Sequence, residues 1–211
     1  MHMLKQSIFA LLLSLILSTP VMAQLAFHQG IDYQLIIPEV KTPDPDKVFV
    51  TEVFWYGCPH CFRFEPYIEQ WADNLPDTVV FEQLPSALSQ NWVNHARTFY
   101  SLQVMGEQKR LHRRFFDAIH VKRQRLNELD GIARFFAGQG IDEAEFRQFF
   151  NSFAVETLLR KNQQRERKYG IDGVPAIIVN GKYRTSVSMA GGNERLIRVI
   201  NFLIAEELKH D

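Results

Sequence analysis

The stretch from Val48 to Cys61 has the sequence V-F-V-T-E-V-F-W-Y-G-C-P-H-C, and it decides the fold. Its first half is an almost unbroken run of β-branched and aromatic residues, which predicts a strand buried on both faces. Gly57 ends that run, and Pro59 suits the first turn of a helix, where its missing N–H would have had no partner. We therefore predict a strand, a tight turn and a helix, with Cys58 at the N-terminal end of the helix and Cys61 one turn further in.

Two cysteines at this spacing predict a redox site. Residues i and i+3 share a helical face, so the two thiols can close a disulfide without unfolding the chain. The partial positive charge and unpaired N–H groups of a helix N-terminus favour a thiolate at Cys58, and a protonated His60 would add to this effect. A lowered thiol pKa stabilises the reduced form, which makes the disulfide more oxidising. Pro59 and His60 between the cysteines thus predict a disulfide donor more than a reductant.

A structural disulfide and a metal site are the alternatives for this cysteine pair. Zinc would need two further ligands, and the histidines at positions 95, 112 and 120 lack the close pairing of a zinc finger. A c-type haem would need a histidine after Cys61, where Phe62 stands. We therefore favour redox chemistry, with Cys58 as the nucleophile and Cys61 as the resolving thiol. We expect no bound metal.

Two motifs together resemble the DsbA family of periplasmic thiol:disulfide oxidoreductases. They are E-V-F-W-Y-G-C-P-H-C at 52–61 and G-V-P-A-I-I-V-N-G-K-Y at 173–183, and F-N-S-F-A-V-E-T-L-L at 150–159 matches more weakly. The resemblance implies an α/β thioredoxin fold with an inserted all-helical domain. It also implies oxidation of reduced, unfolded secreted proteins, re-oxidation by a DsbB-like quinone-linked membrane partner, and no cofactor on the protein itself.

The resemblance extends to three further site residues. Glu52 is out of place in an apolar strand, and a surface-facing edge position is one explanation, because an unpaired buried carboxylate is costly. Its place six residues before Cys58 matches the family's buried acid, which helps to move protons to and from the buried cysteine; the residues do not identify a basic partner for it. Val174-Pro175 matches the family's cis-proline beside the disulfide, which would leave the Val174 backbone free to pair with an extended substrate.

The first 23 residues have the pattern of a secretory signal peptide. Lys5 precedes a ten-residue apolar core, Ile8–Leu17, and Val21-Met22-Ala23 forms a small-residue cleavage site. The apolar core is shorter than the roughly 20 residues that span a bilayer, although a retained anchor is the alternative. We expect export to the periplasm and cleavage after Ala23.

Composition limits the partners and the domain count. The chain has 24 basic and 24 acidic residues, and loss of Lys5 leaves a formal charge of −1, which argues against nucleic acid as a main partner. Its length suits a single domain with an insertion, and we expect a monomer. Both cysteines lie in one C-x-x-C, which favours a reactive disulfide over a structural one.

The remaining pattern divides the mature chain into three segments. We predict strands at 33–37 and 78–84 in a first thioredoxin-like part, residues 24–87. Residues 88–167 show only helical patterns, near 92–104, 108–119, 126–137, 143–150 and 155–168, and are predicted to be the helical insertion. The second thioredoxin-like part, 168–211, contains strands at 176–179 and 182–187, joined by Asn180-Gly181, and a helix at 194–208. Three Phe-Phe pairs in the insertion predict an aromatic core.

Two rival functions remain open at the level of sequence. A disulfide isomerase or reductase could use the same cysteines, but isomerases of this fold usually carry a further dimerisation domain, for which the chain has no room, and usually have Thr at the position of Val174. A thioredoxin-like chaperone module could keep the disulfide only as a structural link. A redox titration separates all three functions.

Overall fold

The computed structural model describes residues 27–209, so the predicted signal peptide lies outside the described residues. Five strands form one sheet in the order β1-β5-β4-β2-β3. The strands are β1 (Gln34–Leu35), β2 (Val48–Phe54), β3 (Val79–Pro85), β4 (Ala176–Val179) and β5 (Tyr183–Ser186). β2 pairs in parallel with β3 and antiparallel with β4, so the predicted buried strand lies inside the sheet.

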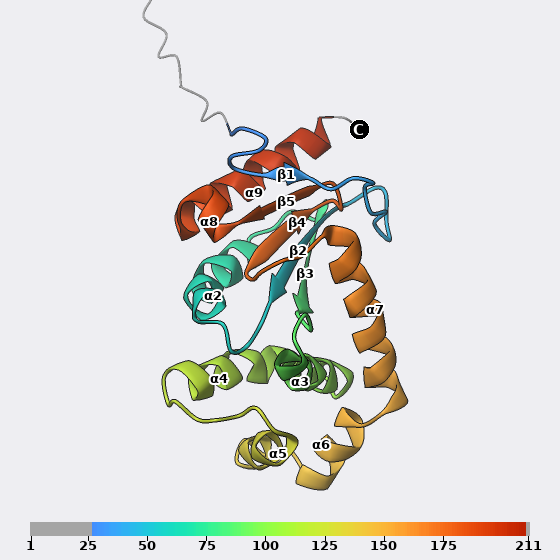
Figure 1. Ribbon diagram of the computed structural model, residues 1–211, viewed down its shortest axis with the longest axis vertical. Coiled ribbons are helices and arrows are strands. Elements are labelled where there is room, and N and C mark those ends of the chain that lie inside the picture. The colour runs from blue at the N-terminus through green and yellow to red at the C-terminus, as the bar shows by residue number, and fades with distance from the viewer. Residues whose placement is uncertain (1–26, 210–211) are drawn as a thin grey trace, which may run out of the picture.

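Helices cover the two faces of the sheet unequally (Figure 1). One face packs on α2 (Pro59–Ala72) and α9 (Asn193–Leu208), through an apolar cluster that includes Val50, Phe64 and Leu203. The other face packs on the C-terminal end of α7 (Phe153–Tyr169), where Val53 and Tyr169 belong to one cluster. Because side chains alternate along a strand, β2 supplies both clusters, as expected of a strand buried on both sides.

A helical layer lies between β3 and β4 in the chain. It comprises the short 3₁₀-helix η1 (Gln90–Trp92) and the helices α3 (Val93–Val104), α4 (Gln108–His120), α5 (Leu129–Ala137) and α6 (Glu143–Phe150), and α7 then returns to the sheet (Figure 1). Phe115, Phe116, Phe136 and Phe150 are buried in its core, so each predicted Phe-Phe pair contributes a core residue. The same cluster contains Cys58 and Cys61, so the layer packs directly on the cysteine pair.

The predicted elements are confirmed, with differences at their ends. The strand expected over 33–37 is only two residues long, and the helix expected from Leu126 begins at Leu129. The strand expected to reach Val187 ends at Ser186, whose hydroxyl accepts a hydrogen bond from Met189 N and begins a short helix, α8 (Val187–Ala190). A serine cap competes with strand continuation at this point. No helix within residues 27–209 is both long and apolar enough for a bilayer crossing.

Candidate active site

The turn between β2 and α2 places Cys58 at the helix N-cap. Cys58 has an extended backbone, its N–H donates to the carbonyl of Trp55 at 2.9 Å, and Pro59 begins the helix. The indole of Trp55 lies against Gly57, where a Cβ atom would stand 2.2 Å from the ring atom Cζ2. Any larger residue at position 57 would displace the indole, so Gly57 allows Trp55 to fold over the backbone just before the cysteines.

The two thiols have opposite electrostatic environments. Both cysteines are free, so the structure describes the dithiol form, with Cys58 6% exposed and Cys61 fully buried. The pKa of Cys58 is lowered to about 6, first by a hydrogen bond from the Cys61 thiol and then, against the effect of burial, by the backbone N–H groups of Cys61 and His60 and by the charge of His60. The pKa of Cys61 is raised well above its usual value, chiefly by burial and then by Cys58.

Val174 and Pro175 lie beside Cys58, although Val174 comes 116 residues later in the chain. The peptide bond between them is cis, and the Cys58 Sγ lies 3.6 Å from the carbonyl oxygen of Val174. Both residues line a cleft of about 570 Å³ together with His60 and Met189. Of the sequence-predicted residues, His60, Val174 and Pro175 thus line this cleft, and Cys58 adjoins it through the Val174 carbonyl.

Glu52 is fully buried, which excludes the exposed edge position. Its Oε2 accepts a hydrogen bond of 3.0 Å from the side-chain amide of Gln83, whereas its Oε1 has no partner. Burial raises the pKa of Glu52 well above its usual value and the negative charge of Glu65 adds to this rise, which the Gln83 hydrogen bond offsets only in part. A negative charge on Glu52 in turn raises the pKa of Cys61, so the two groups interact.

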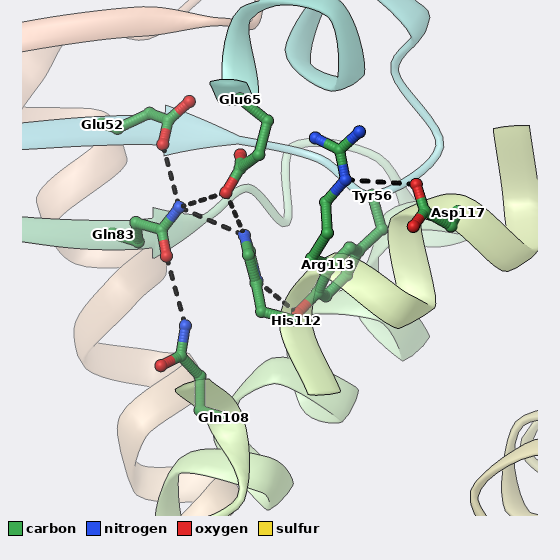
Figure 2. A network of polar contacts seen from close by, with 8 residues as sticks. All are labelled: Glu52, Tyr56, Glu65, Gln83, Gln108, His112, Arg113 and Asp117. Carbon is green, nitrogen blue, oxygen red and sulfur yellow. Dashed lines mark hydrogen bonds and ion pairs between the residues drawn. The ribbon is translucent and has the colours of Figure 1, made fainter. Parts of the chain in front are cut away.

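Four residues that sequence reasoning did not select, Tyr56, Glu65, Gln83 and His112, complete a network around Glu52 (Figure 2). His112 Nε2 lies 2.9 Å from Glu65 Oε1, and its Nδ1 lies 2.8 Å from the hydroxyl of Tyr56. The amide nitrogen of Gln83 faces Glu52, Glu65 and His112 at 3.0, 3.5 and 3.2 Å. Glu65 did carry a signal in the sequence, because it follows Cys61 by four residues and so shares its helical face. The histidine, expected to be an ordinary solvated or core residue, carried none.

His60 points away from this interior network. Its side chain is exposed, and its Nδ1 lies 2.9 Å from a guanidinium nitrogen of Arg63. The predicted absence of a metal site stays a prediction; within residues 27–209, no group of three or more His, Cys, Asp or Glu side chains is arranged to hold a metal ion.

Comparison with known proteins identifies the family of the chain. The model of the DsbA-like thioredoxin domain matches residues 68–203. The thiol:disulfide interchange protein DsbA of Azotobacter vinelandii is 39% identical over 178 residues, which cover 84% of this chain and 83% of the relative. The chain belongs to the DsbA family. As a member of this family, it is a thiol:disulfide oxidoreductase with a thioredoxin fold.

Solved DsbA structures agree with this assignment. The crystal structure of Pseudomonas aeruginosa DsbA superposes with a TM-score of 0.84 at 36% identity and covers 87% of this chain and 96% of that one. The oxidoreductase DsbA from Xylella fastidiosa has a TM-score of 0.81 at 29% identity, with coverage of 88% and 100%. The similarity therefore extends through both the sheet and the helical layer.

Proposed function

We propose that this DsbA-family protein donates the Cys58–Cys61 disulfide to reduced secreted proteins by two exchange steps. A substrate thiolate attacks the Cys58 sulfur, a mixed disulfide forms, and Cys61 leaves as a thiolate that takes up a proton. A second substrate thiolate then attacks the substrate sulfur of the mixed disulfide and releases Cys58 as a thiolate. The substrate is oxidised and the cysteine pair is reduced to a Cys58 thiolate and a Cys61 thiol. Both substrate thiol protons go to solvent, and Cys61 takes its proton from inside the protein.

The difference between the two thiols is the observation that carries this proposal. A Cys58 pKa of about 6 means that the leaving thiolate is stable at neutral pH. At pH 7 this stabilises the dithiol by about 1.4 kcal/mol, or roughly 30 mV towards a more oxidising disulfide. Pro59 begins the helix whose N–H groups face Cys58, and His60 adds a positive charge when protonated. Both features favour disulfide donation over reduction.

Val174 and Pro175 are proposed to hold the substrate. The cleft that they line opens beside Cys58, and its backbone groups can pair with an extended peptide by strand addition. A substrate bound in this way would present its thiolate to the Cys58 sulfur. A substrate that binds as an extended strand must be unfolded, because a folded chain rarely offers a free extended edge.

Glu52 is proposed to exchange a proton with Cys61. As a buried acid, it can give a proton to the Cys61 thiolate when the disulfide opens and take the proton back when the disulfide is restored. Its partnerless Oε1 supports this role, because an oxygen without a fixed hydrogen bond is available to a transferred proton.

Location, domains and re-oxidation follow the family pattern. DsbA proteins are periplasmic, and we propose that residues 1–23 direct export as a cleaved signal peptide. We propose that 24–87 and 168–211 form the thioredoxin-like domain and 88–167 the helical insertion. A DsbB-like membrane protein that passes electrons to quinone would restore the disulfide by accepting them from Cys58 and Cys61.

A redox titration with thiol-specific trapping tests the proposal. Equilibration against glutathione buffers of graded ratio should give a reversible, oxidising potential, and rapid alkylation of the dithiol form should modify Cys58 with a midpoint near pH 6 while Cys61 stays protected. A strongly reducing potential would instead identify a reductase, and resistance to reduction would identify a structural disulfide. Cys61→Ser should accumulate mixed disulfides with a reduced test substrate, whereas Cys58→Ser should form none.

A further inference from the structure

The helical layer places the imidazole of His112 next to a buried glutamate behind the cysteines. Within residues 27–209, Glu65 has one ion-pair partner, His112 of α4, and Glu52 has none. The side chains of His112 and Glu65 are 5% and 0% exposed. A buried carboxylate without a counter-charge is costly, so an ionised Glu65 requires a positive charge on the imidazole.

Aromatic rings hold the imidazole of His112 in place. The rings of Phe54, Phe99 and Phe116 surround it, with centroids 5.2, 5.9 and 5.2 Å away and nearly perpendicular planes. Figure 2 shows the imidazole between Glu65 and Tyr56, with one ring nitrogen facing each. The Tyr56 hydroxyl can accept a hydrogen bond from Nδ1, while Nε2 donates to Glu65 Oε1. Both N–H groups of an imidazolium therefore have acceptors. The amide nitrogen of Gln83, 3.2 Å from Nε2, then directs its two hydrogens to Glu52 and Glu65.

The charges that face this imidazole come from three elements. α2 contributes Glu65 and Glu69, since the charges of both Glu65 and His112 act on Glu69. β2 contributes Glu52, and α4 contributes Arg113, which is directed to Asp117 and to the ring of Phe62. The network proper thus holds two carboxyl groups and one imidazole, and it is neutral when Glu52 is protonated, Glu65 ionised and His112 positively charged.

We propose that His112 is a positioning residue for disulfide exchange. Its positive charge balances the negative charge of Glu65, so that Glu52 is the buried group that gives a proton to Cys61 and accepts it back. This inference rests on the proposed role of Glu52. It assigns to the helical layer an electrostatic part in the reaction, in addition to covering the cysteine pair. His112 touches neither cysteine and acts only through the two glutamates.

The consequence of removing the positive charge has a definite direction. In the wild-type protein, a positive charge on His112 offsets part of the effect of the Glu65 charge, which raises the pKa of Glu52. In His112→Gln this offset is lost, so the pKa of Glu52 rises further and Glu52 keeps its proton to a higher pH. Loss of a nearby opposite charge shifts the pKa of a buried acid by about one unit or more. Glu52 is then less able to accept the Cys61 proton at pH 7, and attack by Cys61 should slow up to about tenfold.

Reaction of the dithiol protein with dithiobis(nitrobenzoate), an aromatic disulfide with a coloured thiol product, separates the two cysteines. The Cys58 thiolate attacks the reagent and releases one coloured thiol in a first phase. Cys61 then attacks the mixed disulfide, loses its proton and releases the second coloured thiol. Stopped-flow traces from pH 5 to 9 thus give one pH profile for each cysteine.

For His112→Gln we expect the midpoint of the second phase to rise by about one pH unit, while the first phase changes less than twofold. His95→Gln is the matched control, because His95 is also a buried histidine of the helical layer but its Nε2 binds the carbonyl of Leu126 at 2.8 Å. Its second-phase midpoint should equal that of the wild type. An unchanged midpoint in His112→Gln, or an equal shift in both variants, overturns the inference.

Glu52→Gln distinguishes failure of this inference from failure of the proposed function. If Glu52→Gln removes the second-phase pH dependence and His112→Gln leaves it intact, Glu52 exchanges the proton without His112. If Glu52→Gln equals the wild type, the proposed role of Glu52 fails, and this inference fails with it. Nitrogen NMR of wild-type His112 at pH 7 needs no variant: an imidazolium supports the inference, and a neutral imidazole overturns it.

Discussion

Glu52 and Glu207 are both buried glutamates next to strand β4, yet their environments act in opposite directions. Glu52 of β2 pairs with Ile177 on the neighbouring strand β4, near the end of the sheet that carries the cysteines. Burial, together with the charge of Glu65, raises the pKa of Glu52. Glu207 of α9 binds Asn180 and Lys182 in the hairpin at the other end of β4. Burial also acts to raise the pKa of Glu207, but hydrogen bonds from Lys182 and Asn180 outweigh it and the pKa is lowered.

This difference gives Glu207 the environment of a structural carboxylate and supports the proton exchange proposed for Glu52. The hairpin supplies an ammonium and an amide, so the charged form of Glu207 is stabilised where it stands. The catalytic interior gives Glu52 a single neutral donor and leaves one oxygen without a partner. A fully partnered acid holds two segments together, whereas an under-partnered acid can still change its protonation state.

The strongest test of the comparison is Glu207→Ala. Asn180 and Lys182 lose this acceptor, and breaking a buried ion pair costs about 3–5 kcal/mol. Because the Lys182 side chain is 38% exposed, solvent screening reduces the expected loss of unfolding free energy to about 2 kcal/mol. Urea unfolding at pH 7 measures this loss, and the rate of disulfide exchange per folded molecule should not change.

Glu206→Ala is the matched control for that variant. Glu206 precedes Glu207 on α9 and pairs with Lys209 at 2.6 Å, but the two side chains are 32% and 58% exposed. An exposed pair contributes about 0.5 kcal/mol or less. Equal losses in the two variants would contradict the view that Glu207 joins the hairpin to α9.

The pH dependence of stability should have opposite signs at the two sites. A raised pKa means that unfolded Glu52 loses its proton before the folded form does, so the wild type loses stability as pH rises above about 4.5. A lowered pKa gives Glu207 a contribution that is present above 4.5 and is lost as pH falls through its folded value. Each effect can reach about 1.4 kcal/mol per pH unit within its window.

Two glutamine variants measure these signs. Relative to the wild type, Glu52→Gln should gain stability as pH rises above 4.5, and Glu207→Gln should approach wild-type stability as pH falls below 4.5. Urea unfolding from pH 3 to 8 provides both difference curves. Two curves of the same sign would show that burial alone governs these acids and that their partners have no influence.

The smallest expected effect concerns His60, at the exposed margin of the catalytic end. The hydrogen bond from the Cys61 thiol is the largest cause of the lowered Cys58 pKa, and the backbone N–H of residue 60 remains in His60→Ala. Loss of the exposed imidazole charge should therefore raise the pKa of Cys58 by about half a unit and make the disulfide slightly less oxidising. The pH dependence of iodoacetamide alkylation measures this shift.

Arg63→Ala is the control for the His60 variant, because Arg63 contacts His60 Nδ1 and is not among the causes of the Cys58 shift. It should leave the alkylation midpoint near pH 6. A rise of two units or more in His60→Ala would mean that the imidazole sets the Cys58 pKa and that the helix terminus contributes little.

Local chemistry made the strands, the helices and the cysteine pair predictable from sequence. Fourteen consecutive residues, 48–61, predict the unit of β2, turn and α2. Asn180-Gly181 predicts the hairpin of β4 and β5 through its backbone preference, and its φ angles are 51° and 65°. Short caps were harder to recognise: the sequence predicts a strand that continues to Val187, whereas Ser186 ends it because its hydroxyl accepts a hydrogen bond from Met189 N.

The partners of Glu52 could not be predicted because they come from separate elements. Gln83 reaches Glu52 only through the parallel register of β2 and β3, and His112 arrives on a helix of the inserted layer. A glutamine between Glu82 and Leu84 in a strand and a histidine in a charged helix have many ordinary explanations in sequence. The network exists only once the helical layer has packed on the sheet.

The position of β4 has a consequence for the order in which a new chain becomes active. In the sheet, β2 lies between β3 and β4. β3 follows β2 within a few dozen residues, but the Val174 carbonyl that faces Cys58 comes 116 residues after Cys58. A chain that emerges N-terminus first therefore exposes its C-x-x-C before the groups that shape the site exist. During that interval the two cysteines are as accessible to disulfide exchange as those of any reduced substrate. A newly made chain of this family is therefore a potential substrate of copies that have already folded.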